Sequence, residues 1–264
     1  MLAIGAGEIE SHGVKTMLLA DKLKRSGDFL FRWRSFILLG FAPFVWNAAS
    51  KPEAIELAIG PLYGGIYEAT CIALVVTGLL VRAFTVGFVP GGTSGRNTAA
   101  QLAKKLNTTG MYSLTRNPLY FGNCLTYAGV FLYTQDVLLA LVAILFLVIY
   151  YERIIMAEED FLCDRFGDAY REWAHDTPAF LPRLNGWKRP ALRFSPRTVL
   201  RREYSGWFAA VICLFLIQAY GDYFVEKDGS LDKPWLIAVA AGAVIYVTLL
   251  TMKKKTRLLA VPGR

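Results

Sequence analysis

The sequence predicts an all-α integral membrane protein with about six transmembrane helices. Of its 264 residues, 55% are hydrophobic and only 19% are charged, and the mean hydropathy is +0.37. This composition is too apolar for an ordinary soluble domain of this length. The apolar residues gather in runs that are long enough to cross a bilayer. Several of these runs begin or end with tyrosine or tryptophan, which is typical of helices that pass through the headgroup layer.

The N-terminal part, residues 1–77, is expected to hold a surface segment and two spans. Residues 1–28 are polar and favour a helix that lies on the surface. The first span covers residues 36–49 and needs the aromatic and basic run at 29–33 to reach the roughly 20 residues that cross a bilayer. The second span covers residues 66–81. We interpret this part of the chain as scaffold.

The central part, residues 78–184, is expected to form the functional core. A loop rich in glycine, serine, threonine and asparagine should cover residues 82–108, with one helix over 97–106. Spans three and four cover residues 119–133 and 137–151. The connection between them is so short that the two spans must be antiparallel neighbours. The core is therefore built around a membrane hairpin.

Span four is expected to continue out of the bilayer as one long helix. No helix-breaking residue occurs over Val137–Phe166, so the helix should carry Glu158 and Glu159 about two turns past the tyrosine pair at the interface. Gly167 is the predicted C-cap, and a short helix should begin at Asp168. The hairpin thus has polar chemistry at the end of its second helix.

The C-terminal part, residues 185–264, should add a basic interfacial segment and two more spans. Prolines are frequent in residues 177–196 and predict an extended segment that returns along the surface. Residues 198–204 are basic and should lie at the interface. Spans five and six cover residues 207–220 and 235–252, and each is entered by tryptophan.

The distribution of basic residues predicts the orientation. All but three of the 29 lysines and arginines fall in segments that a six-span topology places on one side of the membrane, and the exceptions are Lys51, Lys227 and Lys233. The positive-inside rule makes that side the cytoplasm. Both termini are therefore expected in the cytoplasm, and a pocket formed by the core would face it, where a soluble cofactor is available.

The composition also excludes other classes of function. The net charge of +8 comes from basic residues scattered between apolar runs, without the clustered basic surface and stacking aromatics of a nucleic-acid-binding protein. Four cysteines occur without a CxxC pair, and there are only two histidines. Neither a disulfide framework nor a metal site is expected.

Four short motifs carry the polar chemistry of the core. They are Gly110-x-Tyr112, the run Arg116-Asn-Pro-x-Tyr-x-Gly122, the pair Glu158-Glu159, and Phe166-Gly-x-x-Tyr170. This arrangement over residues 78–184 resembles the isoprenylcysteine carboxyl methyltransferase and phospholipid methyltransferase superfamily. The pattern of that superfamily is G-x-Y-x-x-x-R-H-P-x-Y-x-G, a membrane hairpin, E-E-x-x-L and F-G-x-x-Y.

The resemblance implies an S-adenosylmethionine-dependent enzyme that methylates a membrane lipid or a lipid-linked acceptor. The cofactor would lie in the cytoplasm-facing pocket, and the acceptor would reach it from the bilayer. The expected cofactor-binding residues are Tyr112, Arg116, Asn117, Pro118, Tyr120, Glu159 and Tyr170. The expected catalytic residues are Arg116, Arg153, Glu158 and Glu159, with an arginine holding an anionic group and a glutamate orienting the cofactor.

One position departs from the superfamily pattern. Asn117 stands where the superfamily usually has histidine, and an amide can form hydrogen bonds but cannot act as a base. This favours O-methylation of a carboxylate or phosphate, which is already ionised, whereas an amine acceptor would require Glu158 or Tyr170 as a base. The alternatives are a phospholipid amine N-methyltransferase, an NADPH-dependent sterol-type reductase, and a non-catalytic transporter or assembly protein.

Overall fold

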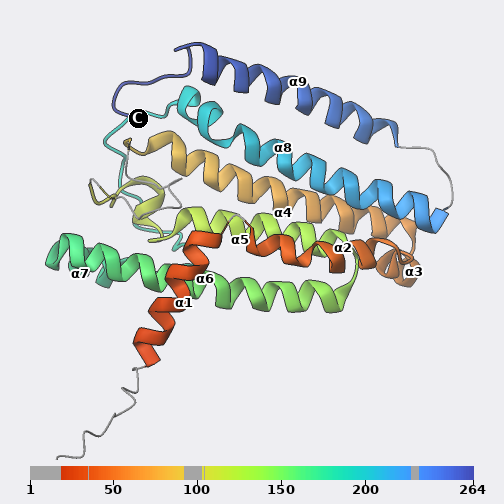
Figure 1. The fold of residues 1–264 in the computed structure, drawn as a ribbon, viewed down its shortest axis with the longest axis horizontal. Coiled ribbons are helices and arrows are strands. Elements are labelled where there is room, and N and C mark those ends of the chain that lie inside the picture. The colour runs from red at the N-terminus through yellow and green to blue at the C-terminus, as the bar shows by residue number, and fades with distance from the viewer. Residues whose placement is uncertain (1–18, 35, 92–102, 104, 227–231) are drawn as a thin grey trace, which may run out of the picture.

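A computed structural model describes residues 19–34, 36–91, 103, 105–226 and 232–264. Every regular element in this part of the chain is a helix, which confirms the all-α prediction (Figure 1). The N-terminal 18 residues and most of the helix predicted over residues 97–106 lie outside the described residues. The elements are α1 (Leu19–Trp33), η1 (Ile37–Phe41), α2 (Ala42–Ala49), α3 (Ala54–Ile59), α4 (Pro61–Phe88), η2 (Gly110–Ser113), α5 (Pro118–Tyr133), α6 (Val137–Phe166), α7 (Asp168–Asp176), α8 (Pro196–Gly221), η3 (Asp222–Glu226) and α9 (Lys233–Lys255).

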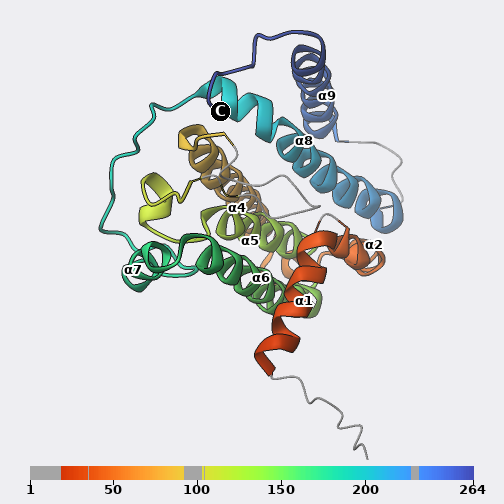
Figure 2. The same ribbon diagram turned by 60° about the vertical axis from the view of Figure 1, so that its left-hand side comes forward.

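The long helices form a layered bundle. Figures 1 and 2 show α9, α8, α4, α5 and α6 following one another across the molecule, with α1 crossing α6 on the outside. Four helices in the described part of the chain are long and apolar enough to cross a membrane, namely α4, α6, α8 and α9. A fifth span is counted if α1 and the η1–α2 unit, which meet at 85°, form one broken span. The protein is therefore an integral membrane protein with four or five candidate spans.

The third predicted span forms a helix with almost the predicted bounds, but this helix is not one of the candidate spans. Helix α5 has only 16 residues, fewer than the roughly 20 that cross a bilayer. It packs against α4 with direct backbone contact: a Cβ atom on Gly122 would lie 2.7 Å from the carbonyl oxygen of Gly78, and one on Gly129 would lie 2.7 Å from Val75 Cγ2. Because glycine permits this close approach, α5 is held by α4 along its length.

The loop predicted from residue 82 begins later than expected. Helix α4 continues through Arg82 to Phe88, because the arginine side chain is paired inside the bundle and does not have to leave the helix for water. The basic segment predicted at 198–204 is likewise part of a helix. Ser195 caps α8, its Oγ accepting a hydrogen bond from the amide of Thr198 at 3.3 Å, so the helix begins before the basic residues.

Helix α6 forms as predicted. It is one continuous helix of 30 residues, and the Asp136 carboxylate accepts a hydrogen bond from the amide of Leu139 at 2.9 Å as its N-cap. Gly167 follows it with a φ of +56°, a left-handed conformation that glycine adopts without strain. The short helix predicted to begin at Asp168 is α7. The two glutamates therefore lie two turns before the end of a rigid helix.

Candidate active site

The motif after residue 109 forms a loop that leads through η2 into α5. A return segment, residues 177–196, runs beside this loop and is hydrogen-bonded to it. The amide of Arg116 donates to the carbonyl of Pro178 at 2.8 Å, and the amide of Gly110 donates to the carbonyl of Lys188 at 2.8 Å. Backbone pairing thus fixes the position of the motif from both sides.

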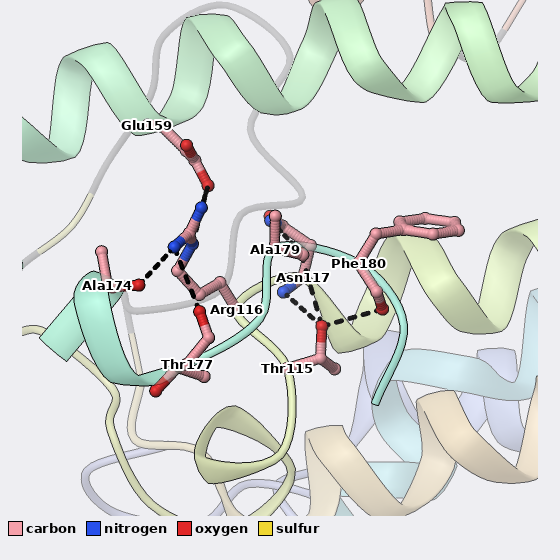
Figure 3. A network of polar contacts seen from close by, with 8 residues as sticks. All are labelled: Thr115, Arg116, Asn117, Glu159, Ala174, Thr177, Ala179 and Phe180. Atoms are coloured by element: carbon pink, nitrogen blue, oxygen red, sulfur yellow. Dashed lines mark hydrogen bonds and ion pairs between the residues drawn. The ribbon is translucent and has the colours of Figure 1, made fainter. Parts of the chain in front are cut away.

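Arg116 connects this loop to the end of α6. Its Nε and one terminal nitrogen contact Glu159 Oε1 at 2.8 and 2.7 Å, and its other terminal nitrogen donates to the carbonyls of Ala174 at 2.6 Å and Thr177 at 3.1 Å (Figure 3). The guanidinium group therefore orients Glu159 and caps the C-terminal end of α7. Most of its donors face the protein, which makes Arg116 better suited to positioning Glu159 than to gripping a ligand.

Glu159 keeps one oxygen available. Both contacts from Arg116 go to Oε1, and within the described part of the chain no hydrogen bond or ion pair reaches Oε2. The Glu159 side chain is 28% exposed. An accessible carboxylate oxygen whose partner oxygen is fixed by an arginine is suited to holding a cationic group.

The adjacent glutamate is paired with a second motif residue. The Tyr120 hydroxyl donates to Glu158 Oε1 at 2.9 Å, and the ring of Tyr120 lies 5.3 Å from that of Tyr151 on α6. Arg116 and Tyr120 thus each hold one of the two neighbouring carboxylates. The structure brings four of the predicted site residues together where the loop, α5 and α6 meet.

Asn117 and Thr115 hold the return segment. The Asn117 side-chain amide donates to the carbonyl of Ala179 at 2.8 Å, and the fully buried Thr115 hydroxyl donates to the carbonyl of Phe180 at 2.9 Å (Figure 3). Pro118 is buried at the first position of α5, where a missing N–H costs nothing. Thr115 was not among the predicted site residues, although its place within the motif could have indicated it.

The two predicted tyrosines outside α5 are largely buried. Tyr170 is 2% exposed and packs edge-on against Trp173, with ring centres 5.5 Å apart. Burial, and then the nearby charge of Glu159, raises the pKa of Tyr170 above its ordinary value. Burial, and then the charge of Glu158, raises the pKa of Tyr112 in the same way. Both hydroxyls stay protonated at neutral pH, so Tyr170 is not suited to act as a general base.

Arg153 lies apart from this group. Its backbone carbonyl faces Gly27 of α1 so closely that any side chain at Gly27 would overlap with it. Among the described residues, no hydrogen bond or ion pair joins Arg153 to Arg116, Tyr120 or the two glutamates. Its predicted catalytic role stays a prediction.

Comparison with known proteins identifies this part of the chain. Residues 69–169 match the phospholipid methyltransferase family. This segment is similar to the members of that family. It contains most of α4, the motif loop and the α5–α6 hairpin with both glutamates. The recognised superfamily is therefore confirmed, and the family implies methyl transfer at a membrane.

Two curated relatives match a shorter stretch. The cobalt-zinc-cadmium resistance protein CzcN of Cupriavidus metallidurans is 39% identical over 80 residues, which cover 30% of this chain and 37% of that protein. The nickel-cobalt-cadmium resistance protein NccN of Alcaligenes xylosoxydans xylosoxydans is 36% identical over 81 residues, covering 31% and 38%. The chain thus matches less than two fifths of the length of either relative. No solved structure matches it significantly.

The methyltransferase segment is attached to α8 by charged residues that the sequence analysis missed. Arg82 Nε and a terminal nitrogen contact Glu203 Oε2 at 2.9 and 2.8 Å, and its other terminal nitrogen donates to Asn123 Oδ1 at 2.5 Å. Glu203 is only 2% exposed. The available signal was a basic residue on one largely apolar helix and an acidic residue on another, because buried charges are paired.

Two pockets lie at opposite ends of the bundle in the described part of the chain. A cavity of about 120 Å³ lies between the end of α4 and the methyltransferase motif and is lined by Thr85, Asn107 and Tyr112, among others. A larger pocket of about 360 Å³ lies at the opposite end of the bundle and includes Glu53 and Glu68 in its lining. Within the described part of the chain, no group of histidine, cysteine, aspartate or glutamate side chains is arranged to hold a metal ion.

Proposed function

We propose that the chain is an S-adenosylmethionine-dependent methyltransferase that O-methylates an anionic carboxylate or phosphate group on a membrane lipid or lipid-linked acceptor. One observation carries the proposal: Arg116 and Tyr120 of the family motif each hold one of the adjacent carboxylates Glu158 and Glu159. The two carboxylates therefore have fixed positions at the end of the hairpin, where a cytoplasmic cofactor and a membrane acceptor would meet.

The side chains present fit this cofactor. When bound, S-adenosylmethionine supplies a methyl group on a cationic sulfonium that leaves as a neutral thioether. Two adjacent carboxylates complement a cation with this charge. Glu159 Oε2 would bind the cofactor's ammonium group, with Arg116 fixing the orientation of the carboxylate. Arg116 acts in this proposal as a positioning residue.

The acceptor is inferred from the side chains that the structure describes near Asn117. The amide of Asn117 donates to a backbone carbonyl and has no basic nitrogen, and burial keeps Tyr170 protonated. A carboxylate or phosphate acceptor needs no base, so the remaining requirement is positioning and exclusion of water. An amine acceptor would depend on Glu158, which already accepts a hydrogen bond from Tyr120.

Transfer of labelled methyl from S-adenosylmethionine in membranes that contain the protein tests this proposal. Label should enter the organic extract, and Glu159→Gln should abolish most of it because the amide cannot neutralise a cation. The matched control is Arg171→Ala, which breaks the exposed Arg171–Asp168 pair on the neighbouring helix and should leave transfer unchanged. Absence of label from the lipid fraction, together with absence of cofactor binding by the purified protein, would overturn the proposal.

The chemistry of the product separates O-methylation from N-methylation. Mass spectrometry of the labelled lipid locates the methyl group on an oxygen or a nitrogen of the headgroup. A carboxyl methyl ester also releases labelled methanol on mild alkaline treatment, whereas a methyl phosphodiester and a methylated amine keep their label. Label on a carboxyl or phosphate oxygen is expected. Label on a headgroup nitrogen would assign the chain to the amine-methylating alternative and would make Glu158 the candidate base.

A further inference from the structure

Four aromatic rings form a patch on the outside of the bundle at the loop end of α4. The ring of Phe84 lies 5.0 Å from Phe88, 5.9 Å from Trp187 and 6.1 Å from Phe194. Phe84, Trp187 and Phe194 are 42%, 44% and 43% exposed. The ring of Phe194 rests directly on the backbone of Gly87, where any side chain would overlap with it. We call these four rings the aromatic patch.

Positive charge surrounds this patch. The return segment and the first turns of α8, residues 177–202, contain seven basic residues and no acidic residue. Lys188 and Arg189 follow Trp187 directly, Arg193 precedes Phe194, and all three are exposed. In Figure 2 the return segment runs along the outside of the bundle between α7 and α8. An exposed aromatic surface is thus combined with strong positive charge.

The patch lies at the level of a membrane interface. Helix α4 is a candidate span of 28 residues, so Phe84 lies about 14 Å from the middle of the helix at a rise of ~1.5 Å per residue. The hydrocarbon core of a bilayer extends about 15 Å from its centre. The rings would therefore contact the upper acyl chains and the glycerol region, and the neighbouring basic side chains would reach the headgroups.

We propose that the aromatic patch, with Lys188, Arg189 and Arg193, is a binding surface for an anionic phospholipid. The rings would contact the apolar part of the lipid, and the three cations would bind its phosphate and acidic headgroup. This inference goes beyond the proposed function because it requires neither cofactor nor methyl transfer. The surface is nevertheless attached to the catalytic motif, since the amide of Lys188 donates to Ser113 Oγ at 2.9 Å.

Quenching of Trp187 fluorescence by brominated lipids tests the proposal. The full-length protein is reconstituted in phosphatidylcholine vesicles that contain increasing amounts of brominated phosphatidylglycerol or, in a second series, brominated phosphatidylcholine. The fluorescence of the Trp187→Phe variant, which keeps the other tryptophans, is subtracted from that of the wild type. The difference reports the quenching of Trp187 alone. Quenching should saturate at a lower fraction of the anionic lipid than of the zwitterionic lipid, and 1 M salt should reduce the difference.

A triple variant tests the basic residues. Lys188→Gln, Arg189→Gln and Arg193→Gln in combination should weaken the preference for the anionic lipid by about fivefold per charge removed. The matched control is Lys254→Gln, Lys255→Gln and Arg257→Gln, which removes three exposed charges at the end of α9 and should keep the preference. Equal quenching by the two lipids, or equal losses in both triple variants, would overturn the proposal. Because the measurement involves no methyl transfer, it remains decisive if the proposed reaction is wrong.

Discussion

The molecule contains two arginine–glutamate pairs with the same local geometry and different surroundings. In each pair, two guanidinium nitrogens contact one carboxylate oxygen, at 2.7 and 2.8 Å for Arg116–Glu159 and at 2.8 and 2.9 Å for Arg82–Glu203. The third nitrogen of Arg116 binds backbone carbonyls at the end of α7, and that of Arg82 binds the side chain of Asn123. The exposed fraction of the glutamate is 28% in the first pair and 2% in the second.

This difference assigns the pairs to different tasks. A partly exposed pair between a loop and a helix end contributes little to stability, because water competes for both charges. A buried pair between helices is costly to break, because the remaining charge has no solvent. Arg116–Glu159 therefore shapes the site, whereas Arg82–Glu203 attaches α8 to the family segment. Variants of the first pair should lose activity with the fold retained, and variants of the second should lose the fold.

The largest effect is expected for Arg82→Ala. This change leaves Glu203 as an unpaired charge inside the bundle, which should lower the free energy of unfolding by about 3–5 kcal/mol. Thermal unfolding of the purified protein in detergent measures the change. The double variant Arg82→Met, Glu203→Leu removes both charges and should recover most of the lost stability. A double variant less stable than Arg82→Ala would show that the pair itself stabilises the bundle.

Arg116→Ala should lower the rate of methyl transfer strongly and the stability only slightly, whereas Arg82→Ala mainly lowers the stability. The rate of methyl transfer should fall about 100-fold, because Glu159 is no longer held in one orientation. The free energy of unfolding should fall by about 1 kcal/mol. Arg116→Lys should show an intermediate rate, since one ammonium group cannot contact Glu159 and both α7 carbonyls at once. A loss of stability as large as that of Arg82→Ala would remove the distinction between the pairs.

Local signals in the sequence were sufficient for α6 and its ends. The unbroken run from Val137, the Asp136 cap and Gly167 predicted a 30-residue helix that carries both glutamates beyond the interface. The motif resemblance also predicted that Arg116 and Tyr120 belong to one site. The resemblance could not predict that Arg116 contacts Glu159 and Tyr120 contacts Glu158, because pairing depends on how α5 rotates against α6.

The sequence did not predict features that depend on contacts between residues far apart in the chain. Arg82 looked like the start of a loop because its partner Glu203 is 121 residues away. The count of six spans depended on α5, whose apolar sequence resembles a span although the helix is short and held by glycine contacts with α4. The division of the chain at residues 77 and 184 and the cytoplasmic location of both termini stay predictions.

The smallest expected effect is a change of stability with pH. It concerns the larger pocket at the other end of the bundle, whose lining includes Glu53 and Glu68 and which we call the acidic pocket. Burial, and then the charge of Glu68, raises the pKa of Glu53 to about 7, and its carboxylate accepts a hydrogen bond from Gln135 at 2.8 Å. An acid whose pKa is raised in the folded state binds its proton more tightly there than in the unfolded chain. Its contribution to stability is therefore present below the unfolded pKa and is lost as pH rises through about 7.

Thermal unfolding is measured at several pH values between 5 and 8. As pH rises, the melting temperature of the wild type should fall relative to that of Glu53→Gln, because the amide of the variant does not titrate. Neither ion pair contributes to the lining of this pocket, so Arg82→Ala should shift the curve downward without changing its slope. The matched control is Glu172→Gln, an exposed carboxylate on α7, which should follow the wild-type curve. Parallel curves for the wild type and Glu53→Gln would show that Glu53 is ionised throughout, and the acidic pocket would then respond to pH no more than the ion pairs do.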